Sequence, residues 1–422
     1  MQNVLTIILA GGAGKRLYPL TKDRAKPAVP FGGRYRIVDF VLSNFVNSGF
    51  YKIYVLTQFK SESLTRHLFL AWRLSPILNH YVEPVPPQMK IGKRWYKGSA
   101  DAVYQNLNLI HDTSPDYVCV FGADHIYKMD VRQMLEYHIQ RRADVTVSAI
   151  PVSLSEGSDF GIIGVDDVWT VTGFDEKPEH PKPIPGQPEK ALASMGNYIF
   201  NTDVLIKEVK KDSKEPTSHD FGRDIITRML GRYKICAYDF SNNKISDTTE
   251  SEEGYWRDVG SIDSYWQANM DLVEVSPIFN LYNKNWPIRS YYPPLPPAKF
   301  VFADKEQGRV GTATDSLVTE GCIISGGNVN RSILSPLVRI NSFSHVSESV
   351  LMEGVNVGRY AKIRRAIIDK YVDIPPNTEI GYNLERDRRR FKVSPSGIVV
   401  VSKKARLEGL KRKGRGKKKV AQ

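Results

Sequence analysis

Residues 4–17 read VLTIILAGGAGKRL, an apolar run that leads directly into a glycine-rich turn. A continuous apolar run of this length is typical of a strand buried on both faces of a parallel sheet. The glycines allow backbone N–H groups to approach a phosphate, and Lys15 and Arg16 add positive charge beside them. This stretch predicts an α/β domain that binds a nucleotide after its first strand.

The turn matches neither of the two common glycine-rich fingerprints. A P-loop requires Gly where Leu9 stands and Ser or Thr where Arg16 stands, and the dinucleotide fingerprint requires a small residue in place of Leu17. Glycines alone are equally consistent with a tight turn that binds nothing. The following RAKP sequence, residues 24–27, adds further phosphate-seeking charge and favours the nucleotide site.

Short apolar runs alternate with amphipathic helical patterns over the first 150 residues, as parallel βαβ units require. We expect strands at 4–10, 53–57, 117–121 and 145–150. One helix is expected to begin at Ser99 as its N-cap and another to follow Asp130. Their inward faces are predicted to carry Val103, Leu107 and Ile110 in the first helix, and Met134, Leu135, His138 and Ile139 in the second.

A different repeat begins after a proline-dense stretch, residues 286–305, which is interpreted as a linker. Aliphatic residues then recur every seventeen positions, in steps of six, five and six, which is typical of a β-helix. A set of ordinary strands in a sandwich is the alternative, but three aligned series argue against it. The series are Ile323, Ile340, Val357 and Ile374; Val329, Val346, Ile363 and Ile380; Leu334, Leu351 and Ile368. We therefore expect domains at 1–285 and 306–402.

The formal charge of +13 is concentrated at the end of the chain. Residues 403–422 have a net charge of +9, which leaves +4 for the rest. The tail lacks interleaved aromatic residues, so we expect a disordered, solvated segment and no nucleic-acid partner. No long apolar run or basic leader appears, which predicts a cytoplasmic protein with no membrane contact. The three cysteines show no metal or disulfide spacing.

Two acids and one lysine are candidates for chemistry in the first domain. Asp124 follows the strand at 117–121, and Asp258 lies in YWRDVG at 255–260; magnesium is commonly held by one or two such carboxylates. Lys177 in FDEKP, 174–178, is a candidate for binding an anionic substrate. Each residue has an ordinary alternative: a turn former for the acids and an exposed ion pair for the lysine.

These motifs occur together and in order in the sugar-nucleotide pyrophosphorylases, and the chain most closely resembles the bacterial ADP-glucose pyrophosphorylase family over about residues 4–402. The resemblance is specific because it includes RAKPAVPFGGRYRIVDF (24–40), WYKGSADA (95–102), GADH (122–125), SHDFG (218–222), YWRDVG (255–260) and NWPIR (285–289). It implies a Rossmann-like nucleotidyltransferase domain with a mostly parallel mixed sheet, followed by a left-handed parallel β-helix.

The family's reaction is in-line transfer of a nucleotide from ATP to glucose 1-phosphate, giving ADP-glucose and diphosphate for glycogen synthesis with Mg²⁺. The resemblance assigns catalysis to Arg16, Lys26 and Asp124, and the metal to Asp124 and Asp258. It assigns the nucleotide to Gly11, Gly12, Ala13, Gly14, Gln58 and Gly98, and glucose 1-phosphate to Tyr96, Gly161, Glu176, Lys177 and Ser194.

The resemblance further implies a homotetramer regulated by anionic metabolites, with Arg24 and Arg36 as candidate effector residues. Asp23 stands where relatives with a sugar-bisphosphate activator carry Lys, so the activator does not transfer with the family. Two alternatives remain open: a pyrophosphorylase that uses UTP, dTTP or GTP, and a non-catalytic regulatory subunit.

Overall fold

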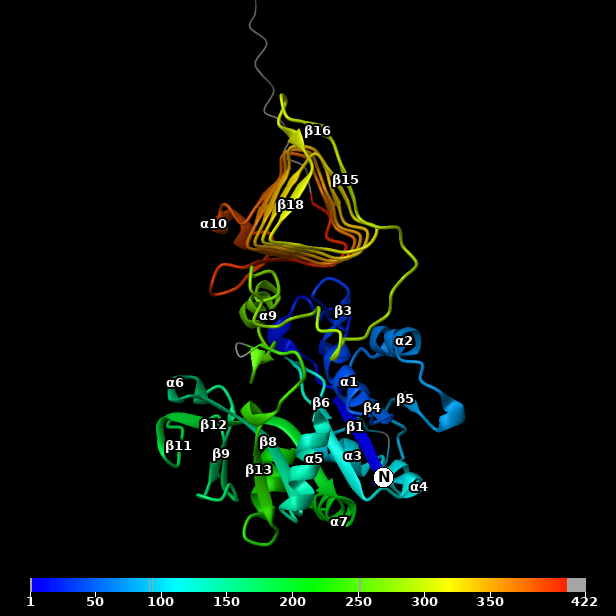
Figure 1. Cartoon of the computed structure of the whole chain (residues 1–422), viewed down its shortest axis with the longest axis vertical. Helices are drawn as coiled ribbons and strands as arrows, with labels where there is room; N and C mark the ends of the chain where they lie inside the picture. The colour runs from blue at the N-terminus through cyan, green and yellow to red at the C-terminus, as the bar shows by residue number, and fades with distance from the viewer. Residues whose placement is uncertain (1, 91, 93, 250–251, 408–422) are drawn as a thin grey trace, which may run out of the picture. The chain divides into compact units, whose positions relative to one another are not determined.

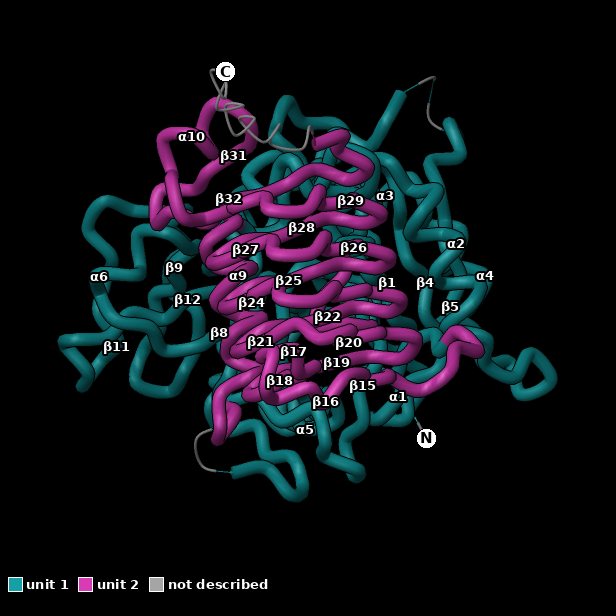
Figure 2. Tube along the Cα trace, turned by 90° about the horizontal axis from the view of Figure 1, so that it is seen from above, with its two compact units in different colours: residues 1–29, 35–260, 278–292 teal, residues 30–34, 261–277, 293–422 magenta. Residues whose placement is uncertain are grey.

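The structure is a computed structural model that describes residues 2–90, 92, 94–249 and 252–407. It divides into two compact units, coloured separately in Figure 2. Unit 1 comprises Met1–Val29, Tyr35–Gly260 and Ile278–Tyr292, and unit 2 comprises Pro30–Arg34, Ser261–Pro277 and Pro293–Gln422. The units interleave along the chain, unlike the consecutive domains that we predicted from the sequence.

Hydrogen bonds show why two early segments belong to unit 2. The hydroxyl of Tyr265 donates to the carbonyl of Pro30, and the indole N–H of Trp266 donates to the carbonyl of Glu348 at 2.9 Å. Both residues lie in α9 (Ile262–Met270), so this helix packs with the β-helix although it precedes the proline-rich stretch. Sequence periodicity contains no information about such distant contacts.

Unit 1 is built on a ten-stranded mixed sheet whose main path runs β10-β9-β12-β6-β1-β4-β5 (Figure 1). β1 pairs in parallel with β4 and β6, β4 with β5, and β8 with β13, whereas β12 is antiparallel to its neighbours. The strands are β1 (Val4–Ala10), β4 (Lys52–Thr57), β5 (Tyr81–Val85), β6 (Tyr117–Gly122), β8 (Val145–Ser153), β9 (Gly161–Val165), β10 (Val171–Glu176), β11 (Pro183–Ile184), β12 (Gln187–Asn201) and β13 (Ile235–Asp239). The four predicted strands and the mostly parallel sheet are confirmed.

Helices cover both faces of this sheet. Alternate residues of β1 therefore pack into two separate hydrophobic cores, one on each face. Ile8 and Ala10 pack in one hydrophobic cluster, and Leu5 and Ile7 in the other. The helices of unit 1 are α1 (Ile37–Asn47), α2 (Glu62–Ala71), α3 (Ser99–Tyr104), α4 (Leu107–Thr113), α5 (Val131–Gln140), α6 (Leu154–Gly157), α7 (Thr202–Asp212), the π-helix η4 (Phe221–Ile226) and α8 (Thr227–Met229).

The two predicted helices differ in outcome. Asp130 is the N-cap of α5, because its carboxylate accepts the backbone N–H of Arg132 at 3.0 Å. The other predicted helix begins at Ser99 as expected but is divided into two helices, α3 and α4. Its N-cap is Gly98, so the prediction of Ser99 as the N-cap was wrong. The Ser99 hydroxyl instead accepts the backbone N–H of Phe221 at 3.0 Å.

Unit 2 contains a parallel β-helix whose three sheets run β15-β20-β23-β26-β29, β18-β21-β24-β27-β30 and β19-β22-β25-β28-β32-β31. The coil strands are β15 (Lys299–Val301), β18 (Thr312–Thr314), β19 (Leu317–Val318), β20 (Ile323–Ser325), β21 (Asn328–Asn330), β22 (Ile333–Leu334), β23 (Arg339–Ile340), β24 (His345–Ser347), β25 (Val350–Leu351), β26 (Asn356–Val357), β27 (Lys362–Arg364), β28 (Ala366–Ile368), β29 (Asp373–Ile374), β30 (Glu379–Ile380), β31 (Lys392–Val393) and β32 (Val399–Val401). The predicted parallel β-helix is confirmed.

Two of the seventeen-residue series hold throughout, and the first contains one error. Val329 aligns with Val346, and Leu334 aligns with Leu351, as predicted. Ile340 aligns with Ile324 rather than Ile323, and Ile324 is the fully buried residue of the two. The first coil is therefore one residue shorter, which the spacing of the later coils could not reveal.

The β-helix extends beyond both predicted ends. β15 pairs with β20, so the helix begins inside the predicted linker 286–305. Ala405 and Leu407 pack against the core, and the N–H of Lys404 donates to the carbonyl of Lys370 at 3.1 Å. The predicted disorder was therefore wrong for residues 403–407, and residues 408–422 lie outside the described residues.

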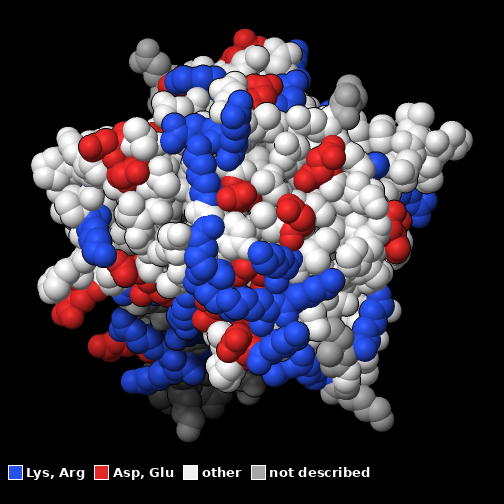
Figure 3. Space-filling view, turned by 90° about the horizontal axis from the view of Figure 1, so that it is seen from below, with Lys and Arg blue, Asp and Glu red and all other residues white. Residues whose placement is uncertain are grey.

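Charge is spread unevenly over the surface, although the chain before the tail has only a small net charge. Lys and Arg side chains gather into a band across the face shown in Figure 3. Searching the described residues, we find no helix long and apolar enough to cross a membrane.

Candidate active site

The carboxylates of Asp124 and Asp258 converge on the amino group of Lys26. Lys26 Nζ lies 3.0 Å from Asp124 Oδ2 and 3.1 Å from Asp258 Oδ1. Asp124 follows β6, and Asp258 is brought to it by the antiparallel pairing of β7 (His125–Tyr127) with β14 (Trp256–Asp258). The structure thus unites three of the predicted site residues from widely separated parts of unit 1.

His125 is part of this cluster, although it was not among the site residues predicted from the sequence. Its Nε2 lies 3.4 Å from Asp124 Oδ1 and 3.9 Å from Asp258 Oδ1. Its buried Nδ1 has no hydrogen-bond partner among the described residues, and its ring packs 5.1 Å from that of Trp256. The signal was present in the GADH motif, where His125 directly follows the aspartate.

These opposite charges shift one another's pKa. Burial raises the pKa of Asp124, but the positive charges of His125 and Lys26 outweigh it and hold that pKa below its ordinary value. Burial lowers the pKa of Lys26, yet Asp124 and Asp258 outweigh this effect and raise it. Both groups are therefore charged at neutral pH.

The same cluster fits a divalent metal ion. Asp124, His125 and Asp258 each offer a ligand atom, and these atoms lie within 4.8 Å of one another. Carboxylate oxygens suit both Mg²⁺ and Mn²⁺. The donor set agrees with the metal residues named from the sequence, whose role remains a prediction.

The glycine-rich turn brings Lys26 and Arg16 to these acids. Gly14 has φ +59, and an added Cβ would lie 2.9 Å from Cβ of Lys26, so only glycine fits without strain. An added Cβ at Gly12 would meet nothing within 4 Å, which leaves space for a ligand beside this backbone. Arg16 follows the turn, and its guanidinium lies 3.8 Å from Asp258.

Gln58 and Tyr96 form a second group beside the turn, and Gly98 follows Tyr96 by two residues. The Gln58 side chain accepts the backbone N–H of Tyr96 at 2.7 Å and donates to its carbonyl at 3.3 Å. An added Cβ at Gly11 would lie 3.1 Å from Cβ of Gln58, which places the turn next to this group. The Tyr96 hydroxyl accepts a hydrogen bond from Asn106 at 2.9 Å.

Four of the five residues predicted to bind the sugar phosphate lie on or directly after adjacent strands, whereas the fifth, Tyr96, lies in the group around Gln58. Gly161 in β9 pairs with Glu176 in β10, and Lys177 follows with φ 50. The Lys177 N–H donates to the carbonyl of Phe160 at 3.0 Å. Ser194 lies in β12, the strand next to β9, and its hydroxyl accepts the N–H of Gly196 at 3.2 Å.

Phe160 connects this group to the carboxylate cluster. Its ring centroid lies 5.2 Å from that of Trp256, which is two residues from Asp258 and also packs against His125. The two groups of predicted residues are thus joined by an aromatic contact.

The predicted effector residues are both engaged with the protein. Arg24 is only 3% exposed. The Arg36 guanidinium donates to the carbonyl of Ala28 at 2.8 Å and to the hydroxyl of Ser63 at 2.9 Å. Their role in effector binding remains a prediction.

A cation held between two carboxylates, next to a glycine-rich turn on a mostly parallel sheet, is the arrangement expected of a nucleotidyltransferase. The family model described as "Nucleotidyl transferase" matches residues 5–275, and "GlmU-like, C-terminal hexapeptide" matches residues 296–401. Nucleotidyltransferases of this kind generally use a divalent metal ion.

Proteins similar to this chain over nearly its whole length identify the family within the nucleotidyltransferases. A protein of Anaeromyxobacter sp. (strain Fw109-5) is 58% identical over 97% of this chain and 100% of its own. A protein of Parafrankia sp. (strain EAN1pec) is 54% identical over 95% of this chain and 97% of its own. A protein of Vibrio parahaemolyticus is 52% identical over 96% of this chain and 100% of its own. All three bear the name glucose-1-phosphate adenylyltransferase, and the chain belongs to that family.

Proposed function

We propose that this protein transfers the adenylyl group of ATP to glucose 1-phosphate, forming ADP-glucose and diphosphate for glycogen synthesis. The observation that carries the proposal is the Asp124–Lys26–Asp258 cluster beside the glycine-rich turn, in a chain 58% identical to a glucose-1-phosphate adenylyltransferase. The intact cluster disfavours a non-catalytic regulatory subunit.

The mechanism requires no covalent enzyme intermediate. A phosphate oxygen of glucose 1-phosphate attacks the α-phosphorus of ATP, the bond to the β-phosphate oxygen breaks, and diphosphate leaves in line. The turn at Gly11–Gly14 presents backbone N–H groups to the triphosphate, and Arg16 and Lys26 stabilise its charge. Lys177 and Glu176 orient the sugar phosphate.

Asp124 and Asp258 are the residues that would hold Mg²⁺, which supplies charge neutralisation on the leaving diphosphate. Lys26 contacts both carboxylates, so its amino group lies beside the proposed metal site. We further propose a cytoplasmic homotetramer that responds to anionic metabolites through Arg24 and Arg36.

ATP should exceed UTP, dTTP and GTP by at least about tenfold in kcat/KM, which corresponds to roughly 1.4 kcal/mol in the transition state. The measurement is diphosphate release with glucose 1-phosphate and each nucleotide in turn. Equal or better use of UTP would indicate a different pyrophosphorylase and contradict the proposal.

Substituting Lys177→Gln should raise the KM for glucose 1-phosphate about tenfold or more while leaving the KM for ATP nearly unchanged. The phosphate charge proposed to bind Lys177 is present in both the ground state and the transition state. The substitution should therefore raise KM and leave kcat nearly unchanged. Lys182→Gln is a matched control, because Lys182 is exposed and pairs with Asp175 at 3.1 Å. Loss of kcat with an unchanged KM would instead place Lys177 at the reacting centre.

A further inference from the structure

The backbone at Gly98 lies directly against the segment 218–221. A Cβ added to Gly98 would lie 2.2 Å from the carbonyl oxygen of Ser218 and 2.4 Å from that of His219. The next residue but one, Ala100, donates its N–H to the His219 carbonyl at 2.7 Å. The position of the Gly98 backbone is therefore set by the position of His219.

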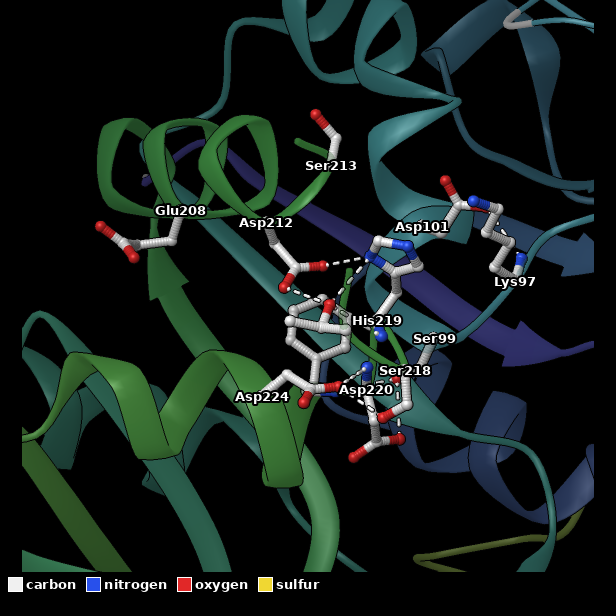
Figure 4. Close-up of polar contacts among 12 residues, drawn as sticks. Lys97, Ser99, Asp101, Glu208, Asp212, Ser213, Ser218, His219, Asp220 and Asp224 are labelled. Atoms are coloured by element: carbon white, nitrogen blue, oxygen red, sulfur yellow. Dashed lines mark hydrogen bonds and ion pairs between the residues drawn. The ribbon is translucent and has the colours of Figure 1, made fainter. Parts of the chain in front are cut away.

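Ser99 strengthens the same contact on its other side. Its hydroxyl donates to the Asp220 carboxylate at 3.1 Å and accepts the N–H of Phe221 at 3.0 Å. Asp220 is also the N-cap of the π-helix η4, and its carboxylate accepts the N–H of Gly222 at 3.0 Å. Figure 4 shows Ser99 and Asp220 directed toward each other from separate elements.

His219 adopts an uncommon backbone conformation. Its φ is 54°, in the left-handed region that residues other than glycine rarely occupy. The imidazole Nδ1 lies 2.7 Å from Asp212 Oδ2, and both side chains are buried (Figure 4). Asp212 Oδ1 accepts from the Thr217 hydroxyl at 2.9 Å and from Arg228 at 3.2 Å, so the partner of His219 is itself fixed.

A second buried carboxylate on α7 shares Arg228 with Asp212 and has two further partners of its own. Glu208 is fully buried; it accepts from Arg232 at 3.0 Å and from the Tyr233 hydroxyl at 3.0 Å. Arg232 and Tyr233 come after η4 in the chain and do not belong to the segment 218–221 that contacts Gly98. Glu208 therefore offers a control that shares the helix, the burial, the charge and Arg228 with Asp212 but, among the described residues, makes no hydrogen bond to His219.

The opposite side of the loop is held by Gln58, which binds both backbone groups of Tyr96. We propose that the Asp212–His219 pair is a positioning group that fixes residues 97–99 from the other side and so shapes the nucleotide pocket. This inference rests on the proposed role of Gln58 and Gly98 in ATP binding.

The test compares His219→Ala, His219→Asn and Glu208→Gln for both KM values, kcat and ATP affinity by calorimetry. His219→Ala should raise the KM and Kd for ATP about tenfold, because small displacements of positioning groups weaken substrate alignment strongly, and should leave the KM for glucose 1-phosphate within about twofold. His219→Asn should restore most of the affinity, since asparagine tolerates positive φ and its amide donates a hydrogen bond. Glu208→Gln should lower the unfolding temperature without changing either KM.

An unchanged KM for ATP in folded His219→Ala would overturn the positioning role. Should that variant not fold, Asp212→Asn replaces it, with an expected rise of about threefold in the KM for ATP; no rise would equally overturn the proposal. Failure of the wild-type protein to bind ATP would refute the proposed function itself, which is a distinct result.

Discussion

Asp124→Asn should lower kcat by about 10²-fold or more, with a smaller effect on either KM, because the lost charge acts mainly on the diphosphate as it leaves. The substitution retains the size of the side chain but removes one of the two carboxylates that face Lys26. Steady-state rates in Mg²⁺ and in Mn²⁺ measure the effect.

A readout independent of turnover accompanies this prediction. Titration with Mn²⁺, followed by electron paramagnetic resonance, should show weaker binding in Asp124→Asn than in the wild type. Asp167→Asn is the matched control, since Asp167 is exposed and lies outside the cluster. Near-normal turnover with unchanged Mn²⁺ binding would remove Asp124 from the metal site.

Gly98→Ala should reduce kcat/KM for ATP about 10²-fold, since a displacement of about 1 Å in a positioning element can have that effect. The new methyl group would clash with two backbone oxygens, which cannot rotate away as a side chain can. The forced shift should also lower the free energy of unfolding by about 1–3 kcal/mol.

Gly12→Ala provides the contrasting case within the same proposed nucleotide site. Its Cβ would meet no atom within 4 Å, so the unfolding temperature should remain at the wild-type value. ATP affinity should nevertheless fall, because the methyl group would occupy the space proposed for the phosphates. Thermal unfolding and ATP calorimetry on both variants separate the two effects; equal stability losses would refute the distinction.

The candidate site was only partly predictable from the sequence. Asp124 follows a readable strand, and the position of a residue at the carboxyl end of a parallel strand is a local property. Lys26 and Asp258 are 232 residues apart, and no periodicity relates them. Asp258 reaches the cluster through the pairing of β7 with β14. Each of these strands has three residues, which is too short to show a strand periodicity in the sequence. His125 directly follows Asp124 in the sequence, but its closeness to Asp258 appears only in the folded chain.

Local sequence was sufficient for the parallel sheet and the β-helix. The apolar run in β1 predicts a strand buried on both faces, and the seventeen-residue series predict coils that repeat the same buried positions. Both patterns can be seen in short stretches of sequence without knowledge of distant contacts. Contacts between distant residues required the folded chain: Ile324 rather than Ile323 faces the core, α9 packs with the β-helix, and Gly98 has no room for a methyl group. These features depend on which surfaces meet after the elements have formed, and that pairing is set by packing across the molecule rather than by any one segment.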